Sequence, residues 1–295
     1  MYTHEYFQYL KSEKRFSVHT IRAYQSDLDQ FCLFMKSEFE ISDITIVHPS
    51  QIRSFVAWMM DCKTSARSVN RKLTCLRSYY KYCIRQQYLI ANPMNKVVSP
   101  KNSKRLPYYI EQKDINHLFN DIIFDDNFLG FRDKAILETF YGTGMRLNEL
   151  RTLTISNLDL NQKTLKVIGK RNKERIIPFG DTMRQSLEAY INILEESFDN
   201  SKQNNYLFVS VKGEQLNPKS IYLIVRKYID QITTIGKRSP HILRHTFATH
   251  LLNEEAELNA IKEMLGHSSL ASTQIYSHNS ISRLKNIYKQ AHPRA

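Results

Sequence analysis

Apolar residues in the first hundred positions recur at helical spacing, and short polar segments interrupt them. After Ser17, which can cap a helix, the apolar positions are Tyr24, Leu28, Phe31 and Met35. Two further helices are predicted over 51–60, opened by a proline, and from about 64 to 85. No glycine occurs in this part of the chain. The pattern therefore predicts a helical first domain.

The third of these helices has two very different faces. One face is apolar and consists of Val69, Leu73, Leu76, Tyr80 and Cys83. The other carries only positive and hydroxyl groups, at Arg67, Arg71, Thr74, Ser78, Lys81 and Arg85. A helix that lies against phosphates needs such a face, whereas an ordinary solvated face usually mixes both signs of charge. The candidate DNA contacts are Arg67, Arg71, Lys72, Arg77, Lys81 and Arg85.

The pattern changes towards the C-terminal part. Residues 91–107 contain three prolines and no strong periodicity, which is typical of a linker. Helices are then predicted over about 112–122, 131–141, 182–196, 218–231, 240–252 and 258–265, and short strands over 164–168 and 175–178. We therefore predict a mainly α protein with a small antiparallel β-sheet. Its parts are a helical domain at 1–90, a linker at 91–107 and a second domain at 108–295.

Charge adds a functional hint to this outline. The 295 residues carry a formal net charge of +13, and residues 62–110 hold eleven Lys and Arg without any Asp or Glu. Such a stretch in a folded chain points to a polyanion, most simply nucleic acid. The sequence shows neither a long apolar run nor the apolar core of a signal peptide, and its four cysteines lack CxxC spacing. We therefore expect a cytoplasmic protein without a membrane span, a disulfide framework or a zinc site.

Candidate chemistry lies in the last third of the chain. His241 and Arg244 are three residues apart on a predicted helix and share a face, where a guanidinium can bind a phosphate bidentately. His241 and His245 have the spacing of a helical zinc pair, but Arg244 between them would repel a cation, so we expect no metal. Neither a Walker loop nor a Gly-x-Ser-x-Gly motif is present. If the site breaks a phosphodiester, a tyrosine is an attractive nucleophile, and Tyr276 stands out among the tyrosines through its place after His267.

Five fragments, taken in order, carry a resemblance. They are Gly142-Thr-Gly-Met-Arg-Leu-Asn-Glu149, Val167-Ile-Gly-Lys170, His241-Ile-Leu-Arg-His245, Leu265-Gly-His267 and Tyr276. Together they resemble the tyrosine recombinase/integrase family, most closely the Xer recombinases, over nearly the whole chain. The resemblance implies an N-terminal core-binding, SAM-like domain and a mostly helical catalytic domain. It also implies that the catalytic residues are Arg146, Lys170, His241, Arg244, His267 and the nucleophile Tyr276.

The resemblance further implies a mechanism that needs no metal, cofactor or ATP. Tyr276 forms a 3′-phosphotyrosyl bond, the two arginines and His267 hold the non-bridging oxygens, His241 helps to accept the tyrosine proton, and Lys170 protonates the leaving oxygen. Glu149 lies one turn from Arg146 and is a candidate for orienting it, with an ordinary surface role as the alternative. Arg171 stands where the family often has glycine, so Lys173 stays open as an alternative to Lys170.

The implied function is site-specific recombination, with chromosome dimer resolution as the role of the Xer group. The implied partners are double-stranded DNA with an inverted-repeat site, a paralogous recombinase in a tetramer on two sites, and a DNA translocase of the FtsK type. Two alternatives stay open, an integrase of a phage or conjugative element and a non-catalytic DNA-binding regulator. The absence of an extra N-terminal arm-binding domain favours the Xer role over the integrase.

The segment after Tyr276 shows an apolar stripe at Ile281, Leu284, Ile287 and Tyr288. A helix this short needs something to pack against. It can pack on its own catalytic domain or on a neighbouring subunit, and the family resemblance implies the neighbour.

Overall fold

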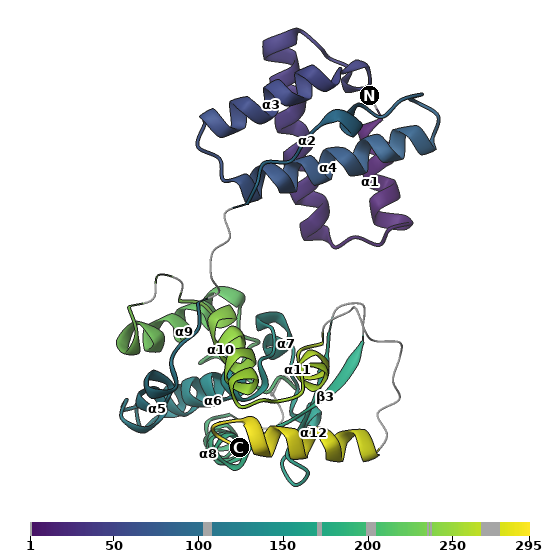
Figure 1. The fold of residues 1–295 in the computed structure, drawn as a ribbon. Helices are drawn as coiled ribbons and strands as arrows, with labels where there is room; N and C mark the ends of the chain where they lie inside the picture. The colour runs from purple at the N-terminus through teal and green to yellow at the C-terminus, as the bar shows by residue number, and fades with distance from the viewer. Residues whose placement is uncertain are drawn as a thin grey trace. The chain divides into compact units, whose positions relative to one another are not determined.

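The computed structural model describes residues 2–102, 108–169, 173–198, 205–234, 236, 238–266 and 278–295. The chain divides into two compact units, Met1–Arg105 and Leu106–Ala295 (Figure 1). Both units are built mainly from helices, and the second contains a small antiparallel sheet, so the predicted fold class is confirmed. Within the described ranges, every helix is too short or too polar to cross a membrane.

The first unit is a bundle of four helices around one apolar core. The helices are α1 (Thr3–Ser12), α2 (Val18–Phe39), α3 (Pro49–Asp61) and α4 (Ala66–Arg85), with a 3₁₀ turn at Ile44–Ile46. The Oγ atoms of Ser17 and Ser65 accept hydrogen bonds from backbone N–H groups in the first turns of α2 and α4, which fixes where these helices begin. The helix α1 was not predicted, although its Tyr6 and Leu10 are fully buried.

The helix α4 presents its apolar face to this core, as its sequence pattern predicts. Val69, Leu73 and Tyr80 are completely buried, and the Tyr80 hydroxyl donates to the Ile44 carbonyl. Part of the predicted linker also packs here, because a 3₁₀ turn at Pro93–Lys96 brings Met94 into the core. Apolar contacts at these positions thus extend the first unit into residues that the prolines and the lack of periodicity assigned to the linker.

The second unit is organised around α6 (Phe128–Thr143), in which residues 135–143 are all buried. The helices around it are α5 (Gln112–Asn120), α7 (Leu147–Arg151), α8 (Asp181–Ser197), α9 (Pro218–Ile232), α10 (Pro240–Asn253), α11 (Leu258–Leu265) and α12 (His278–Ala291). Gly144 ends α6 with a φ of +58°, and a Cβ there would lie 2.5 Å from a Phe247 ring atom. Glycine is therefore needed to let α10 approach the end of α6 this closely.

The sheet consists of β1 (Leu158–Asp159), β2 (Thr164–Ile168) and β3 (Glu174–Pro178), all antiparallel. In the β2–β3 hairpin, Leu165 pairs with Ile177 and Val167 pairs with Arg175. All four of these side chains are buried, while Lys166 and Ile168 are exposed. Arg175 thus occupies a position on the buried face of the hairpin that the alternation would normally give to an apolar residue.

The helix α12 packs on its own unit. Leu284, Tyr288 and Ala291 are buried in a cluster with Phe247 and Leu251 of α10 and with apolar residues of α11. The chain then continues to its end against α6 and α8, where the Arg294 guanidinium pairs with the buried Glu138 carboxylate at 2.6 Å. The stripe is thus covered by its own domain, which offers the apolar surface that it needs, and docking of this segment on a neighbouring subunit stays a prediction.

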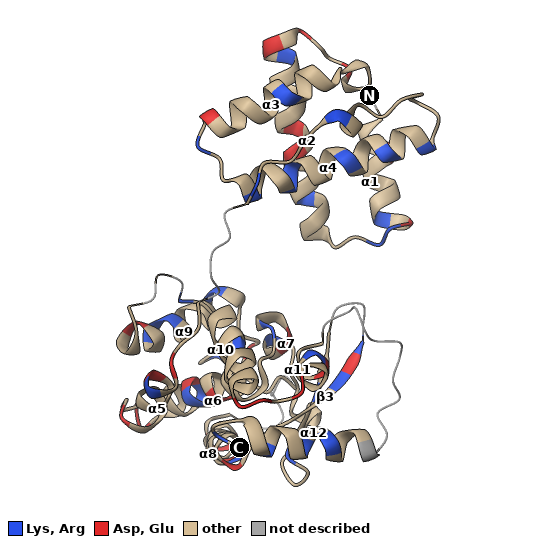
Figure 2. Cartoon of the chain, in the orientation of Figure 1, with Lys and Arg blue, Asp and Glu red and all other residues tan. Residues whose placement is uncertain are grey.

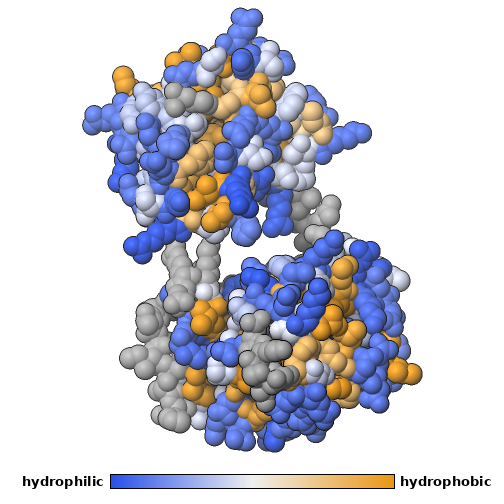
Figure 3. Space-filling view, turned by 180° about the vertical axis from the view of Figure 1, so that it is seen from behind, coloured by the Kyte–Doolittle hydropathy of each residue, from blue (hydrophilic) through white to orange (hydrophobic). Residues whose placement is uncertain are grey.

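Charged and apolar side chains are distributed as expected for folded units with solvated surfaces. Basic residues follow α4 without an acidic one among them (Figure 2). On the face shown in Figure 3, apolar side chains are interspersed among hydrophilic ones, and the exposed apolar residues come from many different elements.

Candidate active site

Arg146 stands at the N-terminus of α7, directly after the Gly142-Thr-Gly144 break that ends α6. The Glu149 carboxylate lies in the first turn of α7 and turns back to this end. Its Oε2 accepts from the Arg146 backbone N–H at 2.7 Å, and its Oε1 accepts from Arg146 Nη1 at 2.8 Å. This local contact fixes both the main chain and the guanidinium of Arg146.

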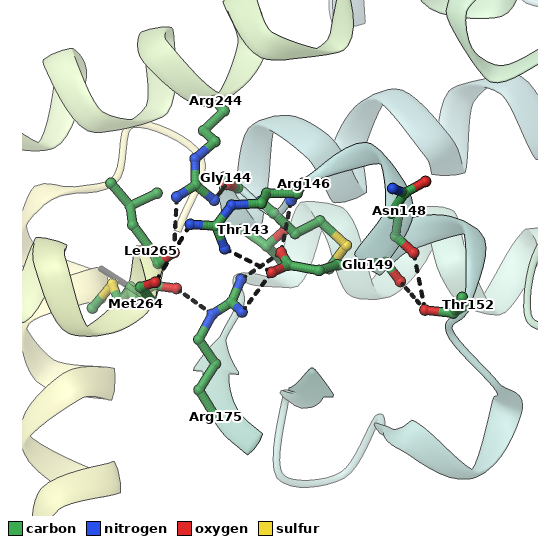
Figure 4. Close-up of polar contacts among 12 residues, drawn as sticks. Thr143, Gly144, Arg146, Asn148, Glu149, Thr152, Arg175, Arg244, Met264 and Leu265 are labelled. Carbon is green, nitrogen blue, oxygen red and sulfur yellow. Dashed lines mark hydrogen bonds and ion pairs between the residues drawn. The ribbon is translucent and has the colours of Figure 1, made fainter. Parts of the chain in front are cut away.

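Arg244 reaches the same place from α10. Its Nη1 donates to the Gly144 carbonyl at 2.6 Å and its Nη2 to the Leu265 carbonyl at 2.8 Å. Arg146 Nη2 donates at 3.4 Å to the carbonyl of Gly266, the residue that follows Leu265 in the chain. The two guanidinium groups therefore meet at the C-terminal end of α11, although about a hundred residues separate them in the sequence (Figure 4).

A third arginine, which the sequence analysis did not single out, completes this cluster. Arg175 donates from Nη1 and Nη2 to the two carboxylate oxygens of Glu149 at 3.0 and 2.8 Å, and from Nε to the Met264 carbonyl at 2.8 Å. Only 4% of the residue is exposed. The available signal was the strand alternation, because the register places Arg175 on the same face as Ile177 and opposite Val167.

Electrostatics within the cluster follow from burial and from the three cations. Burial would raise the pKa of Glu149, but the Arg175 hydrogen bonds and charge, together with those of Arg146, lower it below its ordinary value. Burial and the positive charge of Arg146 lower the pKa of Arg244 to about 10, so this guanidinium stays charged at neutral pH. Three arginines and one carboxylate leave a net positive site that suits a phosphodiester.

The histidines of α10 differ in their surroundings. His241 is exposed, and desolvation by its neighbours and the positive charge of Arg244 lower its pKa, so it is neutral at neutral pH. A neutral imidazole can accept a proton. His245 is also exposed, whereas His250 is buried and its Nδ1 lies 2.9 Å from the Tyr141 hydroxyl. His250 therefore has a structural contact.

Three of the predicted catalytic residues, Lys170, His267 and Tyr276, lie outside the described residues. The described chain ends on either side of them, at Gly169 and Lys173 for the hairpin and at Gly266 before the last motif. The Gly169 backbone N–H donates to the Lys173 carbonyl at 2.7 Å, which closes the hairpin below its turn. Both Gly169 and Gly266 border the arginine cluster, since a Cβ at either would lie within 3.3 Å of an Arg175 side-chain atom.

The predicted DNA contacts on α4 fall into two groups. Arg67 and Lys81 are exposed, and the described part of the chain gives them no ion pair or hydrogen bond. Arg71 and Lys72 both pair with Asp27 of α2, whose carboxylate is almost completely buried. These two cations therefore compensate a buried negative charge in addition to any role towards DNA.

The other two basic residues of α4 also have internal partners. Arg77 donates from Nη2 to the Val97 carbonyl at 3.2 Å and to the Ser99 hydroxyl at 3.0 Å, which ties the following segment to the helix. Arg85 donates to the Tyr9 hydroxyl and lies 3.5 Å from a Glu13 oxygen. The sequence could not separate these residues from Arg67 and Lys81, because their partners lie on other elements.

Comparison with known proteins places this geometry in a family. Residues 109–283 match the Phage integrase family, and residues 3–87 match the Phage integrase, N-terminal SAM-like domain. The chain belongs to the phage integrase family. It is a tyrosine recombinase, an enzyme that cuts and rejoins DNA. The recombinase spans nearly the full length of its curated relatives.

This tyrosine recombinase is 38% identical to "Tyrosine recombinase XerC" of Oceanobacillus iheyensis, over 100% of its own chain and 97% of the relative. It is 36% identical to "Tyrosine recombinase XerD" of Staphylococcus haemolyticus, over 99% and 98% of the two chains. The structure of the XerH site-specific recombinase bound to palindromic difH substrate has the same fold, with a TM-score of 0.75 at 21% identity over 95% and 82% of the chains.

Proposed function

We propose that this protein is a site-specific recombinase of the Xer type that cleaves DNA through a covalent bond to Tyr276. The observation that carries the proposal is the convergence of Arg146 and Arg244 at the end of α11. Each guanidinium now donates to backbone carbonyls and keeps further N–H donors, which a phosphate can engage bidentately. The full-length similarity to recombinases named XerC and XerD supports the same assignment.

The proposed division of roles follows the chemistry of each group. Arg146 and Arg244 bind the non-bridging oxygens and stabilise the additional charge of the transition state. His241, neutral at physiological pH, helps to take the proton from Tyr276, and His267 donates to a non-bridging oxygen. Lys170 protonates the leaving 5′-oxygen, and the phosphotyrosyl bond conserves the energy for rejoining, so the reaction requires no metal and no ATP.

The proposed biological role is resolution of chromosome dimers at cell division, in the cytoplasm where the chromosome lies. Relatives named XerC and XerD match this chain about equally well, which supports a paralogous recombinase as the partner. The proposed assembly is a tetramer on two inverted-repeat DNA sites, with a DNA translocase of the FtsK type as a further partner. The basic face of α4, first of all Arg67 and Lys81, supplies phosphate contacts in this assembly.

The central test is covalent trapping. A duplex is selected from a random-sequence library by binding to the protein, and a series of copies is nicked at successive central positions, so that cleavage releases a short fragment and traps the adduct. The wild-type protein is expected to form a protease-sensitive covalent complex. Tyr276→Phe is expected to bind the same duplex and form none. Adduct formation by the phenylalanine variant would show that the nucleophile lies elsewhere, and no adduct with the wild type would favour a non-catalytic regulator.

The choice between Lys170 and Lys173 can be tested with a substrate in which sulfur replaces the leaving 5′-oxygen. A thiolate leaves without protonation, so this substrate needs no general acid. Lys170→Ala is expected to lose cleavage of normal DNA and to recover it with the sulfur substrate. Lys173→Ala serves as the matched variant, and the same pattern in Lys173→Ala alone would assign the acid to Lys173.

A further inference from the structure

We infer that Arg175 is a positioning residue for the cleavage step: it compensates the charge of Glu149 and connects the three chain segments that lead into the proposed catalytic residues. This inference rests on the proposed function, since it concerns how the proposed site is held. Nothing in the position of Arg175 on a short strand suggests such a role. Its contacts in the folded chain carry the argument (Figure 4).

The first observation is that Arg175 serves the Glu149 carboxylate. The carboxylate oxygens accept four hydrogen bonds, two from Arg175 and two from Arg146, which uses their capacity fully. Both Glu149 and Arg175 are buried, with side-chain exposures of 6% and 5%, whereas the Arg146 side chain is 37% exposed. Arg175 is therefore the inner partner of the carboxylate, and Arg146 is the partner on the side open to a ligand.

The charge balance gives this arrangement a consequence for phosphate binding. Arg175 and Glu149 together are neutral, so Arg146 and Arg244 keep their two positive charges for a phosphodiester. Without Arg175, the same carboxylate would neutralise Arg146 at a hydrogen-bond distance of 2.8 Å. The site would then hold one effective positive charge where the transition state of phosphoryl transfer needs more.

The second observation is that Arg175 connects the segments around the cluster. It starts from β3, its guanidinium meets Glu149 in α7, and its Nε donates to the Met264 carbonyl in the last turn of α11. Gly266, with a φ of +66°, lets the chain after α11 pass beside the same guanidinium, since a Cβ there would lie 3.2 Å from its Cδ and Nη1 atoms. The Arg175 side chain thus lies against three segments: the start of α7 with Arg146, the hairpin before Lys170 and the chain before His267.

The test compares single-turnover adduct formation with DNA affinity in Arg175→Met, Glu149→Gln and the double variant. Arg175→Met is expected to slow adduct formation by roughly 10- to 100-fold, the range found when partners that orient metal ligands are removed. Its DNA affinity should change much less, because most phosphate contacts lie elsewhere. Removing the uncompensated charge in Arg175→Met/Glu149→Gln is expected to restore part of the lost rate, which loss of packing alone could not explain.

A pH profile gives a second readout. In Arg175→Met, burial of Glu149 is no longer offset by Arg175, so the pKa of its carboxyl rises. Lowering the pH should then neutralise this carboxyl and increase the rate of Arg175→Met relative to the wild type. The double variant should lack this relative increase. Equal pH profiles for Arg175→Met and the wild type would overturn the charge-compensation part of the inference.

The matched control is Arg132→Met. Arg132 is also a buried arginine, 7% exposed, which pairs with Asp133 at 2.8 Å and donates to the Val209 carbonyl, away from the arginine cluster. Its loss should lower stability but leave the cleavage rate of the folded protein unchanged. If Arg175→Met does not fold, Arg175→Lys replaces it, because lysine keeps the charge without the bidentate contact. A slower cleavage rate for Arg175→Lys than for Arg132→Met would then support the inference, and equal rates would contradict it. Wild-type rates in all Arg175 variants would refute the inference, while a missing adduct in the wild type would refute the proposed function instead.

Discussion

The packing of α12 leads to a prediction about Leu284. This side chain is 2% exposed and lies among Phe247, Leu251 and the apolar residues of α11. Leu284→Ala removes buried methyl groups and leaves a cavity, which costs about 2–5 kcal/mol in the free energy of unfolding. A unit of this size loses about 2–4 °C of melting temperature per kcal/mol, so a central value of about 3 kcal/mol predicts a decrease of roughly 6–12 °C.

The two units allow an assay with an internal control. The only tryptophan, Trp58, lies in α3 of the first unit, where it contacts Phe34 and Phe55. Its fluorescence therefore reports unfolding of the first unit, while far-ultraviolet circular dichroism reports the helices of both. Leu284→Ala should lower the melting temperature of the transition seen by circular dichroism and leave that of the Trp58 fluorescence transition unchanged. Both results should be the same at low and high protein concentration.

A matched variant and a contrary result complete this test. Leu252 stands next to the buried Leu251 in α10 but is 46% exposed, so Leu252→Ala should change stability little. If Leu284→Ala were as stable as Leu252→Ala in dilute solution, α12 would not pack on its own unit there. If Leu284→Ala also impaired assembly on two-site DNA, that result would indicate that α12 docks on the neighbouring subunit.

Three further predictions follow from the structure. Gly144→Ala places a Cβ 2.5 Å from a Phe247 ring atom at a φ of +58°, so it should destabilise the second unit by about 2–5 kcal/mol in urea unfolding; an unchanged midpoint would contradict this backbone geometry. Arg67→Gln and Lys81→Gln should each reduce the slope of log binding constant against log salt concentration for DNA by about 0.9. Arg77→Gln should leave this slope unchanged, because the Arg77 guanidinium already binds the Val97 carbonyl. Burial lowers the pKa of His292 to about 3, so unfolding takes up a proton below about pH 6.5, and the free energy of unfolding should fall as the pH decreases from there to pH 3. Between pH 7.5 and pH 5 the decrease is up to about 2 kcal/mol. His292→Phe should lose less free energy of unfolding over the same pH interval.

The sequence by itself determined the local elements and the residue types of the site. The period of apolar residues predicted α4 and its buried face because a helix exposes each side chain at a fixed angle, whatever it packs against. The alternation of the hairpin and the glycine break before Arg146 are local in the same sense. His241 and Arg244 could be chosen because their spacing and chemistry fit a phosphate, whereas Arg146 was assigned through the resemblance of its motif to the recombinase family.

Only the tertiary structure decided which of these groups meet and which surface is free. The strand alternation places Arg175 on the buried face of its hairpin, but its pairing with Glu149 depends on three segments that converge in space. The apolar stripe of α12 required a partner surface but could not specify whose, and the fold supplied it from α10 and α11. The basic face of α4 likewise loses part of its free charge to Asp27, because charges pair through space and a helical period carries no information about the neighbouring element.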